Sequence, residues 1–278
     1  MSDLSTVPLV SLMNLSSSLT SLDLRSCQLH GELPDNIFQS HNLQRLRLRG
    51  NHLSGPIPWS SLNLESLIYL DLSSNKFIGQ LPEVFSNSTK KFSSYDSSKY
   101  PLGSFPSNLE SLYLSRNLLN GSIPSWIFEL PNLVNLGIGR NKLHGVIPRS
   151  IFQQVKLQYL DLSSPAFTVN VELEDLSKLK ELDTLDLSFN NVSWNYNNSK
   201  NYTLNNRLDL VLSSCNLTEF PLFLKSMQRL GGLDLSSNQL RGSVPKWLWE
   251  VGKCMRSSFD HQEEQVLYPG SRGVALKT

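Results

Sequence analysis

Leucines recur along this chain at fixed offsets from nine anchor positions. Consecutive anchors lie 23 to 25 residues apart, except for one gap of 42 residues. Leucine lies five residues before every anchor, Leu or Ile lies three before it, and an apolar residue lies two after it. The anchors are Cys27, Asn51, Asn75, Asn117, Asn141, Pro165, Asn190, Cys215 and Asn238. Because the leucines before each anchor alternate with other residues, each coil is expected to contain one short strand.

A single coil of this length cannot bury its own leucines, so neighbouring coils must cover them. The run L-x-x-L-x-L-x-x-N/C-x-L is the pattern of leucine-rich repeats. We therefore predict an α/β fold. It is a leucine-rich-repeat solenoid with a concave parallel β-sheet and an irregular or 3₁₀ convex side.

The anchors themselves are predicted to form a ladder of side chains. An asparagine amide at the end of a strand can bond to backbone groups of adjacent coils that would otherwise be buried unpaired. Cys27 and Cys215 occupy the same slot, and we interpret both as ladder residues and not as redox or metal sites. Pro165 has no side-chain donor, so a local defect in the ladder is expected at that coil.

A second signature, Gly-x-(Ile/Leu/Val)-Pro, begins four residues after six of the anchors, as in Gly31–Pro34 and Gly145–Pro148. The combined pattern resembles the plant-specific class of leucine-rich repeats. Three stretches, at 171–180, 213–223 and 242–249, resemble the ectodomains of plant leucine-rich-repeat receptor-like proteins of the Cf type.

The repeat pattern also predicts the domain organisation. We expect an incomplete N-terminal coil without a cap at 1–18, the solenoid at 19–250 with an insertion at 83–108, and a disordered, non-repeat tail at 251–278. The resemblance implies capping cysteine pairs, a signal peptide and a transmembrane helix. The sequence shows none of these, so it is interpreted as a partial ectodomain or a truncated product.

Composition and motifs argue against catalysis. The formal net charge of +1 does not favour nucleic-acid binding. Three cysteines and five scattered histidines follow no ligand spacing, and no nucleophile elbow or phosphate loop is present. We predict no enzymatic activity, no metal and no cofactor.

Seven N-x-Ser/Thr sequons are candidate glycosylation sites. They lie at Asn14, Asn87, Asn120, Asn191, Asn197, Asn201 and Asn216. Asn197 and Asn201 fall in a predicted loop and are the best candidates.

Departures from the repeat scaffold predict the binding surface. Asp in L-D-L-S is common scaffold usage in the resembling family, whereas arginines and tyrosines beside the inward leucines are not. Arg and Tyr are also enriched where interfaces carry binding energy. The predicted ligand-binding residues on the concave face are Arg45, Arg47, Arg49, Tyr69, Tyr113, Asn135, Arg140 and Tyr159.

The resemblance implies a recognition module on the extracellular side of the plasma membrane. In defence or peptide perception, it would bind a protein, peptide or oligosaccharide ligand and signal through partner receptor kinases. Two alternatives stay open. One is a secreted protein similar to the polygalacturonase inhibitors, although the insertion and the missing caps argue against it. The other is a non-functional truncated product.

Overall fold

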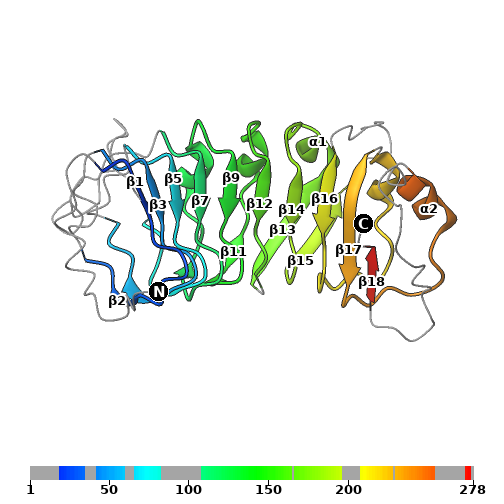
Figure 1. Ribbon diagram of the computed structural model, residues 1–278. Coiled ribbons are helices and arrows are strands. Elements are labelled where there is room, and N and C mark those ends of the chain that lie inside the picture. The colour runs from blue at the N-terminus through cyan, green and yellow to red at the C-terminus, as the bar shows by residue number, and fades with distance from the viewer. Residues whose placement is uncertain are drawn as a thin grey trace, which may run out of the picture. The chain divides into compact units, whose positions relative to one another are not determined.

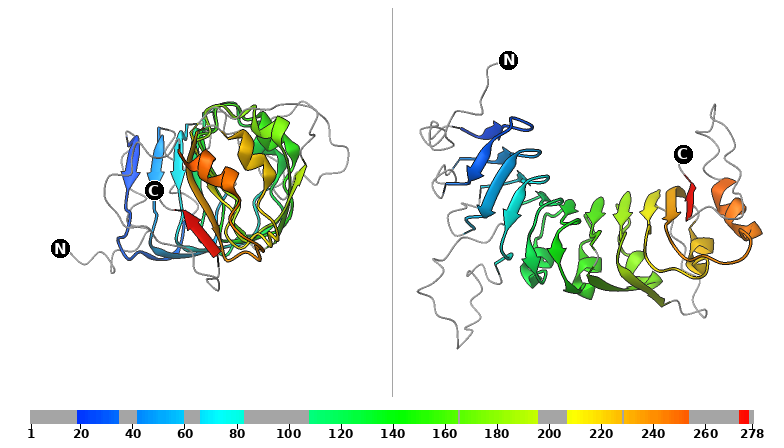
Figure 2. Two further views of the ribbon diagram at one scale, coloured as in Figure 1. Left: turned by 90° about the vertical axis from the view of Figure 1, so that its right-hand side faces the viewer. Right: turned by 90° about the horizontal axis from the view of Figure 1, so that it is seen from below.

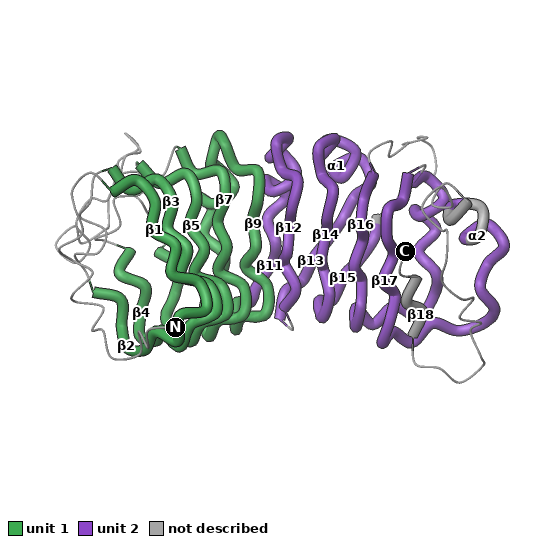
Figure 3. The backbone as a smooth tube through the Cα atoms, in the orientation of Figure 1, with its two compact units in different colours: residues 1–143 green, residues 144–278 purple. Residues whose placement is uncertain are grey.

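The computed structural model describes residues 19–34, 42–59, 66–82, 108–164, 166–195, 207–227, 229–253 and 273–276. It divides into two compact units, residues 1–143 and residues 144–278 (Figure 3). The predicted segment 1–18, most of the predicted insertion, and Pro165 lie outside the described residues.

Unit 1 is a parallel-strand β-solenoid in which each coil contributes one strand to a main sheet. The register pairs equivalent residues of successive coils, such as Leu22 with Leu46 and Leu46 with Leu70. Successive strands follow one another in chain order (Figures 1 and 2). The strands are β1 (Ser21–Asp23), β3 (Arg45–Arg47), β5 (Tyr69–Asp71), β7 (Ser111–Tyr113) and β9 (Asn135–Gly137).

The other side of each coil in unit 1 is built from shorter pieces. A second parallel sheet contains β2 (His30–Glu32), β4 (His52–Pro56) and β6 (Lys76–Ile78), and a separate pair contains β8 (Asn120–Gly121) and β10 (Lys142–Leu143). The 3₁₀ helix η3 (Ser125–Glu129) starts directly after Pro124. A proline suits this place because its φ is fixed and it needs no hydrogen-bond partner for an N–H.

Unit 2 repeats this plan. Its main sheet contains β12 (Tyr159–Asp161), β14 (Thr184–Asp186), β16 (Leu208–Val211) and β17 (Leu230–Ser236), all parallel, with β18 (Gly273–Leu276) antiparallel to β17. Its second sheet contains β11 (Gly145–Val146), β13 (Phe167–Glu172) and β15 (Asn191–Asn195). The helical pieces are η4 (Arg149–Gln153), α1 (Leu173–Leu176), η5 (Leu222–Ser226) and α2 (Lys246–Lys253).

The core is the leucine interior that the spacing predicts. Leu46, Leu70, Leu136 and Leu210 are completely buried. Burying a leucine side chain stabilises the folded state by about 1.5–3 kcal/mol, so most of the stabilisation resides in contacts between one coil and the next. The predicted fold class is confirmed, including the 3₁₀ segments opposite the main sheet.

Backbone turns explain the second signature. The glycines that open the Gly-x-x-Pro turns all have positive φ, for example +94° at Gly31 and +108° at Gly145. A Cβ is disfavoured in that conformation, so glycine is the natural residue there. The residue before the anchor is also left-handed in most coils, and at Phe189 (φ +67°) a bulky side chain occupies this position.

The C-terminal region contains two described elements. Helix α2 extends to Lys253, across the predicted end of the solenoid, and Leu248 on this helix is buried. Strand β18 pairs with the last long strand of unit 2, from Leu233–Leu276 to Ser236–Gly273. Residues 254–272 between them are outside the described part of the chain.

Candidate binding face and anchor ladder

The anchor asparagines join adjacent coils through both the nitrogen and the oxygen of their side-chain amides. Asn51 Nδ2 donates to the carbonyl oxygens of Leu24, one coil earlier, and of Leu48 in its own coil, both at 2.8 Å. Its Oδ1 accepts from the backbone N–H groups of Cys27 and Leu29 at 3.0 Å. The side chain thus satisfies four backbone groups, three in the preceding coil and one in its own.

The same pattern recurs at the other asparagine anchors. The Nδ2 groups of Asn75, Asn117, Asn141, Asn190 and Asn238 each donate to two or more carbonyl oxygens of their own and the preceding coil. All of these anchors except Asn238 are buried.

The two cysteine anchors use a thiol in place of the amide. Cys215 Sγ donates to Leu187 O at 3.2 Å, and Cys27 Sγ donates to Arg25 O at 3.4 Å. Burial raises the pKa of the Cys215 thiol to about 11. The thiol is therefore neutral at physiological pH and is a poor nucleophile or metal ligand.

The ladder is interrupted one coil after Pro165. In other coils the N–H two residues after an anchor donates to Oδ1 of the next anchor, as Leu53 donates to Asn75 and Leu217 to Asn238. Asn190 Oδ1 is buried and has no hydrogen-bond partner within the described part of the chain. The N–H of Phe167, two residues after Pro165, does not bond to this oxygen, and Pro165 itself lacks the N–H that the anchors Cys27 and Cys215 donate at this place.

Most aspartates on the main sheets have a local structural partner. Asp71 Oδ1 accepts from the N–H of Ser73 at 3.0 Å and from its hydroxyl at 2.5 Å. Asp161 makes the same two bonds with Ser163. These two L-D-L-S carboxylates are buried, and each is held by a serine of its own coil.

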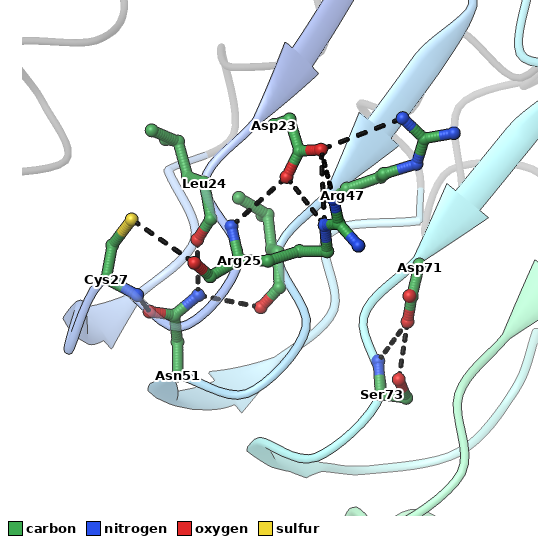
Figure 4. A network of polar contacts seen from close by, with 9 residues as sticks. Asp23, Leu24, Arg25, Cys27, Arg47, Asn51, Asp71 and Ser73 are labelled. Carbon is green, nitrogen blue, oxygen red and sulfur yellow. Dashed lines mark hydrogen bonds and ion pairs between the residues drawn. The ribbon is translucent and has the colours of Figure 1, made fainter.

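The first coil of unit 1 departs from this scaffold. Arg25 replaces the serine, and its guanidinium donates to both carboxylate oxygens of Asp23 at 2.9 Å (Figure 4). Arg47 Nη1 lies 3.7 Å from Asp23 Oδ2. The hydrogen bond from Arg25 lowers the pKa of Asp23 below its usual value. Asp23 is thus shared by two guanidinium groups.

An aromatic pair continues the arginine cluster across the sheet. The Arg47 guanidinium lies 4.6 Å from the centre of the Tyr69 ring, and the Tyr69 and Tyr113 rings lie 5.6 Å apart. Burial raises the pKa of Tyr113 to about 12, so its hydroxyl stays protonated. We name Arg25, Arg45, Arg47, Arg49, Tyr69 and Tyr113 the Arg–Tyr face.

The remaining predicted binding residues are placed as follows. Asn135 on β9 donates to the Ser111 hydroxyl at 3.0 Å and is half-buried. Arg140 is exposed, follows β9 and has a left-handed backbone (φ +53°). Tyr159 is half-buried on β12, in unit 2. Arg45, Arg47, Arg49, Tyr69 and Tyr113 come from the adjacent strands β3, β5 and β7 of unit 1 or directly follow them.

Sequence reasoning missed a polar cluster on the other side of unit 2. Arg149 donates to Asp175 Oδ2 and to Glu172, and Lys178 donates to Asp175 Oδ1 at 2.8 Å. Although burial raises the pKa of Asp175, the hydrogen bonds from Lys178 and Arg149 outweigh it and lower the pKa overall. The sequence does not predict this cluster, because no spacing rule places Arg149 next to Asp175.

Three of the predicted glycosylation sites are described, and all three are exposed: Asn120, Asn191 and Asn216. Asn14, Asn87, Asn197 and Asn201 lie outside the described residues. Among the described residues no group of three or more His, Cys, Asp or Glu side chains could hold a metal ion. No helix in the described ranges has the length and hydrophobicity needed to span a bilayer.

Comparisons with known proteins agree with this architecture. Two models described as leucine rich repeat match, one at residues 107–167 and 131–192, the other at 18–40, 42–64, 66–88 and 229–251. Receptor-like protein 49 of Arabidopsis thaliana is 41% identical over 167 residues, covering 57% of this chain and 19% of the relative. Receptor like protein 24 of the same plant is 35% identical over 151 residues, covering 54% of this chain and 15% of the relative. The chain thus matches about a fifth or less of the length of these relatives.

Solved structures with the same fold include plant receptor ectodomains. The ectodomain of the Arabidopsis thaliana membrane receptor kinase GASSHO1/SCHENGEN3, in complex with CASPARIAN STRIP INTEGRITY FACTOR 2, is 31% identical with a TM-score of 0.62. The similarity covers 84% of this chain and 29% of that one. The plant peptide hormone receptor RGFR1, in complex with RGF2, is 25% identical with a TM-score of 0.53, covering 82% of this chain and 41% of that one. Repeat, ladder and comparisons together assign this chain to the leucine-rich-repeat proteins, and plant receptor-like proteins are among its similar relatives.

Proposed function

We propose that this chain is a ligand-recognition module of a plant cell-surface receptor-like protein. The observation that carries the proposal is the Arg–Tyr face. At offsets where other coils have Asp paired with Ser, unit 1 has Arg25, Arg47 and Tyr113. Such side chains are frequent at the energetic centre of protein interfaces. Peptide complexes of the structurally similar receptors support a peptide or protein as the ligand.

The finer parts of the proposal follow from the family. The parent molecule would be located at the plasma membrane with this module outside the cell, and it would act in defence or peptide perception. It would signal through a partner receptor kinase, as the resemblance to receptor-like proteins implies. Asn120, Asn191 and Asn216 are exposed sequon residues and would carry glycans.

Photocrosslinking tests the binding surface directly. A benzophenone amino acid replaces Tyr69 on the Arg–Tyr face, and in a matched variant it replaces Ile78, which is 48% exposed on β6 of the second sheet. Both proteins are irradiated with the peptide fraction of plant extracellular fluid. We expect peptide adducts at position 69 that an excess of unmodified chain suppresses, and few at position 78. Equal labelling at the two positions would contradict the proposal.

A further inference from the structure

The charges of the Arg–Tyr face are only partly compensated. Asp23 engages Arg25 and Arg47, and the buried carboxylate of Asp71 is bonded to Ser73. Arg45 and Arg49 are exposed and make no ion pair with any described residue. Two guanidinium groups on and just after β3 are therefore available to an incoming anion. The planar guanidinium fork matches a carboxylate particularly well.

The aromatic pair lies beside these cations at a defined separation. Arg45 is in register with Tyr69 on the next strand, and Asp71 is in register with Tyr113 on the strand after that. Strands are spaced by about 4.8 Å, so β3 and β7 lie roughly 10 Å apart. An extended peptide advances about 3.3–3.6 Å per residue and covers this distance in about three residues.

We infer that the Arg–Tyr face binds an extended acidic peptide that runs across the strands. One carboxylate pairs with Arg45 and Arg49, and an aromatic or large aliphatic side chain two or three residues away packs on the Tyr69–Tyr113 rings. This inference rests on the proposed function and specifies its ligand. Charge complementarity selects the acidic residue, because Asp23 already engages Arg25 and Arg47, and the buried Asp71 carboxylate is bonded to Ser73.

A display selection tests this ligand class. The full 278-residue chain is immobilised, and a library of random twelve-residue peptides on phage is selected against it. We expect enrichment of Asp or Glu two or three positions from Trp, Tyr, Phe or Leu. Selected peptides, synthesised with amidated and with free carboxyl ends, separate a side-chain carboxylate from a terminal one. Their binding should weaken as salt is raised, because exposed charges are screened.

Matched variants connect binding to the named residues. Arg45→Gln/Arg49→Gln removes two positive charges and should weaken binding about tenfold. Lys76→Glu changes the net charge by the same amount on the exposed side of β6 and should have little effect. Tyr113→Val, which introduces the residue that another coil has at this offset in Val211, should also weaken binding. Circular dichroism melts of all variants check that the fold is retained.

The outcomes separate the inference from the proposed function. Peptides without acidic enrichment, or bound equally well by Arg45→Gln/Arg49→Gln, would overturn the inference. If Tyr113→Val still weakened their binding, the proposed recognition function would stand. If no selected peptide depended on any residue of the Arg–Tyr face, both would fail.

Discussion

The thiol of Cys215 donates to the carbonyl oxygen of Leu187 at 3.2 Å, the place that an asparagine amide occupies in other coils. For comparison, Asn238 Nδ2 donates to the equivalent carbonyl oxygen of Leu212 at 2.7 Å. The cysteine is thus part of the anchor ladder. Its chemistry follows from that position, because burial disfavours the thiolate.

This position predicts that Cys215 resists thiol–disulfide exchange. In a variant with Cys27 and Cys254 changed to serine, native protein at pH 8 should react with a disulfide reagent far more slowly than the unfolded chain. The pKa of about 11 leaves little thiolate at that pH, and the side chain is buried. Thiol release is measured with and without denaturant. Similar rates in the two states would contradict the ladder role.

The unpaired oxygen of Asn190 predicts a stabilising substitution. Pro165→Asn supplies a backbone N–H like the one that Cys215 donates to Asn238, and an unpaired buried acceptor costs about 1–3 kcal/mol. Loss of the proline's rigidity offsets about 0.4–1 kcal/mol of this gain. We expect a net increase of about 1 kcal/mol in the free energy of unfolding, measured by urea denaturation. In an Asn190→Ala background the gain should disappear.

The buried leucines make a simple test of the register. Leu136 is fully buried on β9, so Leu136→Asp places a charge in the leucine interior without a partner. We expect loss of the β signal in circular dichroism and loss of a cooperative melt. Leu136→Ala, as a milder change, should lower stability by about 2–5 kcal/mol. A normal melt of the aspartate variant would be incompatible with this register.

Asp175 predicts an acid-sensitive contribution to stability. Its pKa is lower in the folded state than the ordinary value of 3.8, so the folded state favours the carboxylate. The stabilisation is therefore fully present above about pH 4 and is lost as pH falls through the lowered folded pKa. Asp175→Asn should destabilise the chain at pH 7 and much less near pH 3. A difference between the two proteins that does not change with pH would exclude this role.

Left-handed backbone at Phe189 predicts that glycine is better there. The residue has φ of +67° and is 46% exposed, so Phe189→Gly relieves backbone strain that outweighs the loss of the ring's partial burial. We expect a gain of about 0.5–1 kcal/mol in the free energy of unfolding. Leu118 is similarly exposed, at 42%, but is not among the left-handed residues, so Leu118→Gly should destabilise instead. Both are measured by thermal melting.

Much of the fold could be predicted without a structure, because the repeat places the same physical demand on every coil. The 24-residue spacing of Leu22, Leu46 and Leu70 already implies in-register parallel strands. The positive φ of Gly31 and Gly145 is likewise a local property that the Gly-x-x-Pro pattern indicates. The expected ladder defect at Pro165 stays a prediction, because Pro165 lies outside the described residues.

Tertiary structure was needed wherever side chains from different coils choose among several partners. Sequence identified the arginines and tyrosines as departures from the scaffold. It could not show that Arg47 lies over Tyr69, or that Asp23 engages Arg25 while Arg45 and Arg49 have no ion pair within the described ranges. A long, flexible side chain can reach several neighbours in conformations of similar energy. Packing and charge across the strands decide which neighbour it contacts. The positions of the buried leucines, by contrast, follow from the periodicity alone.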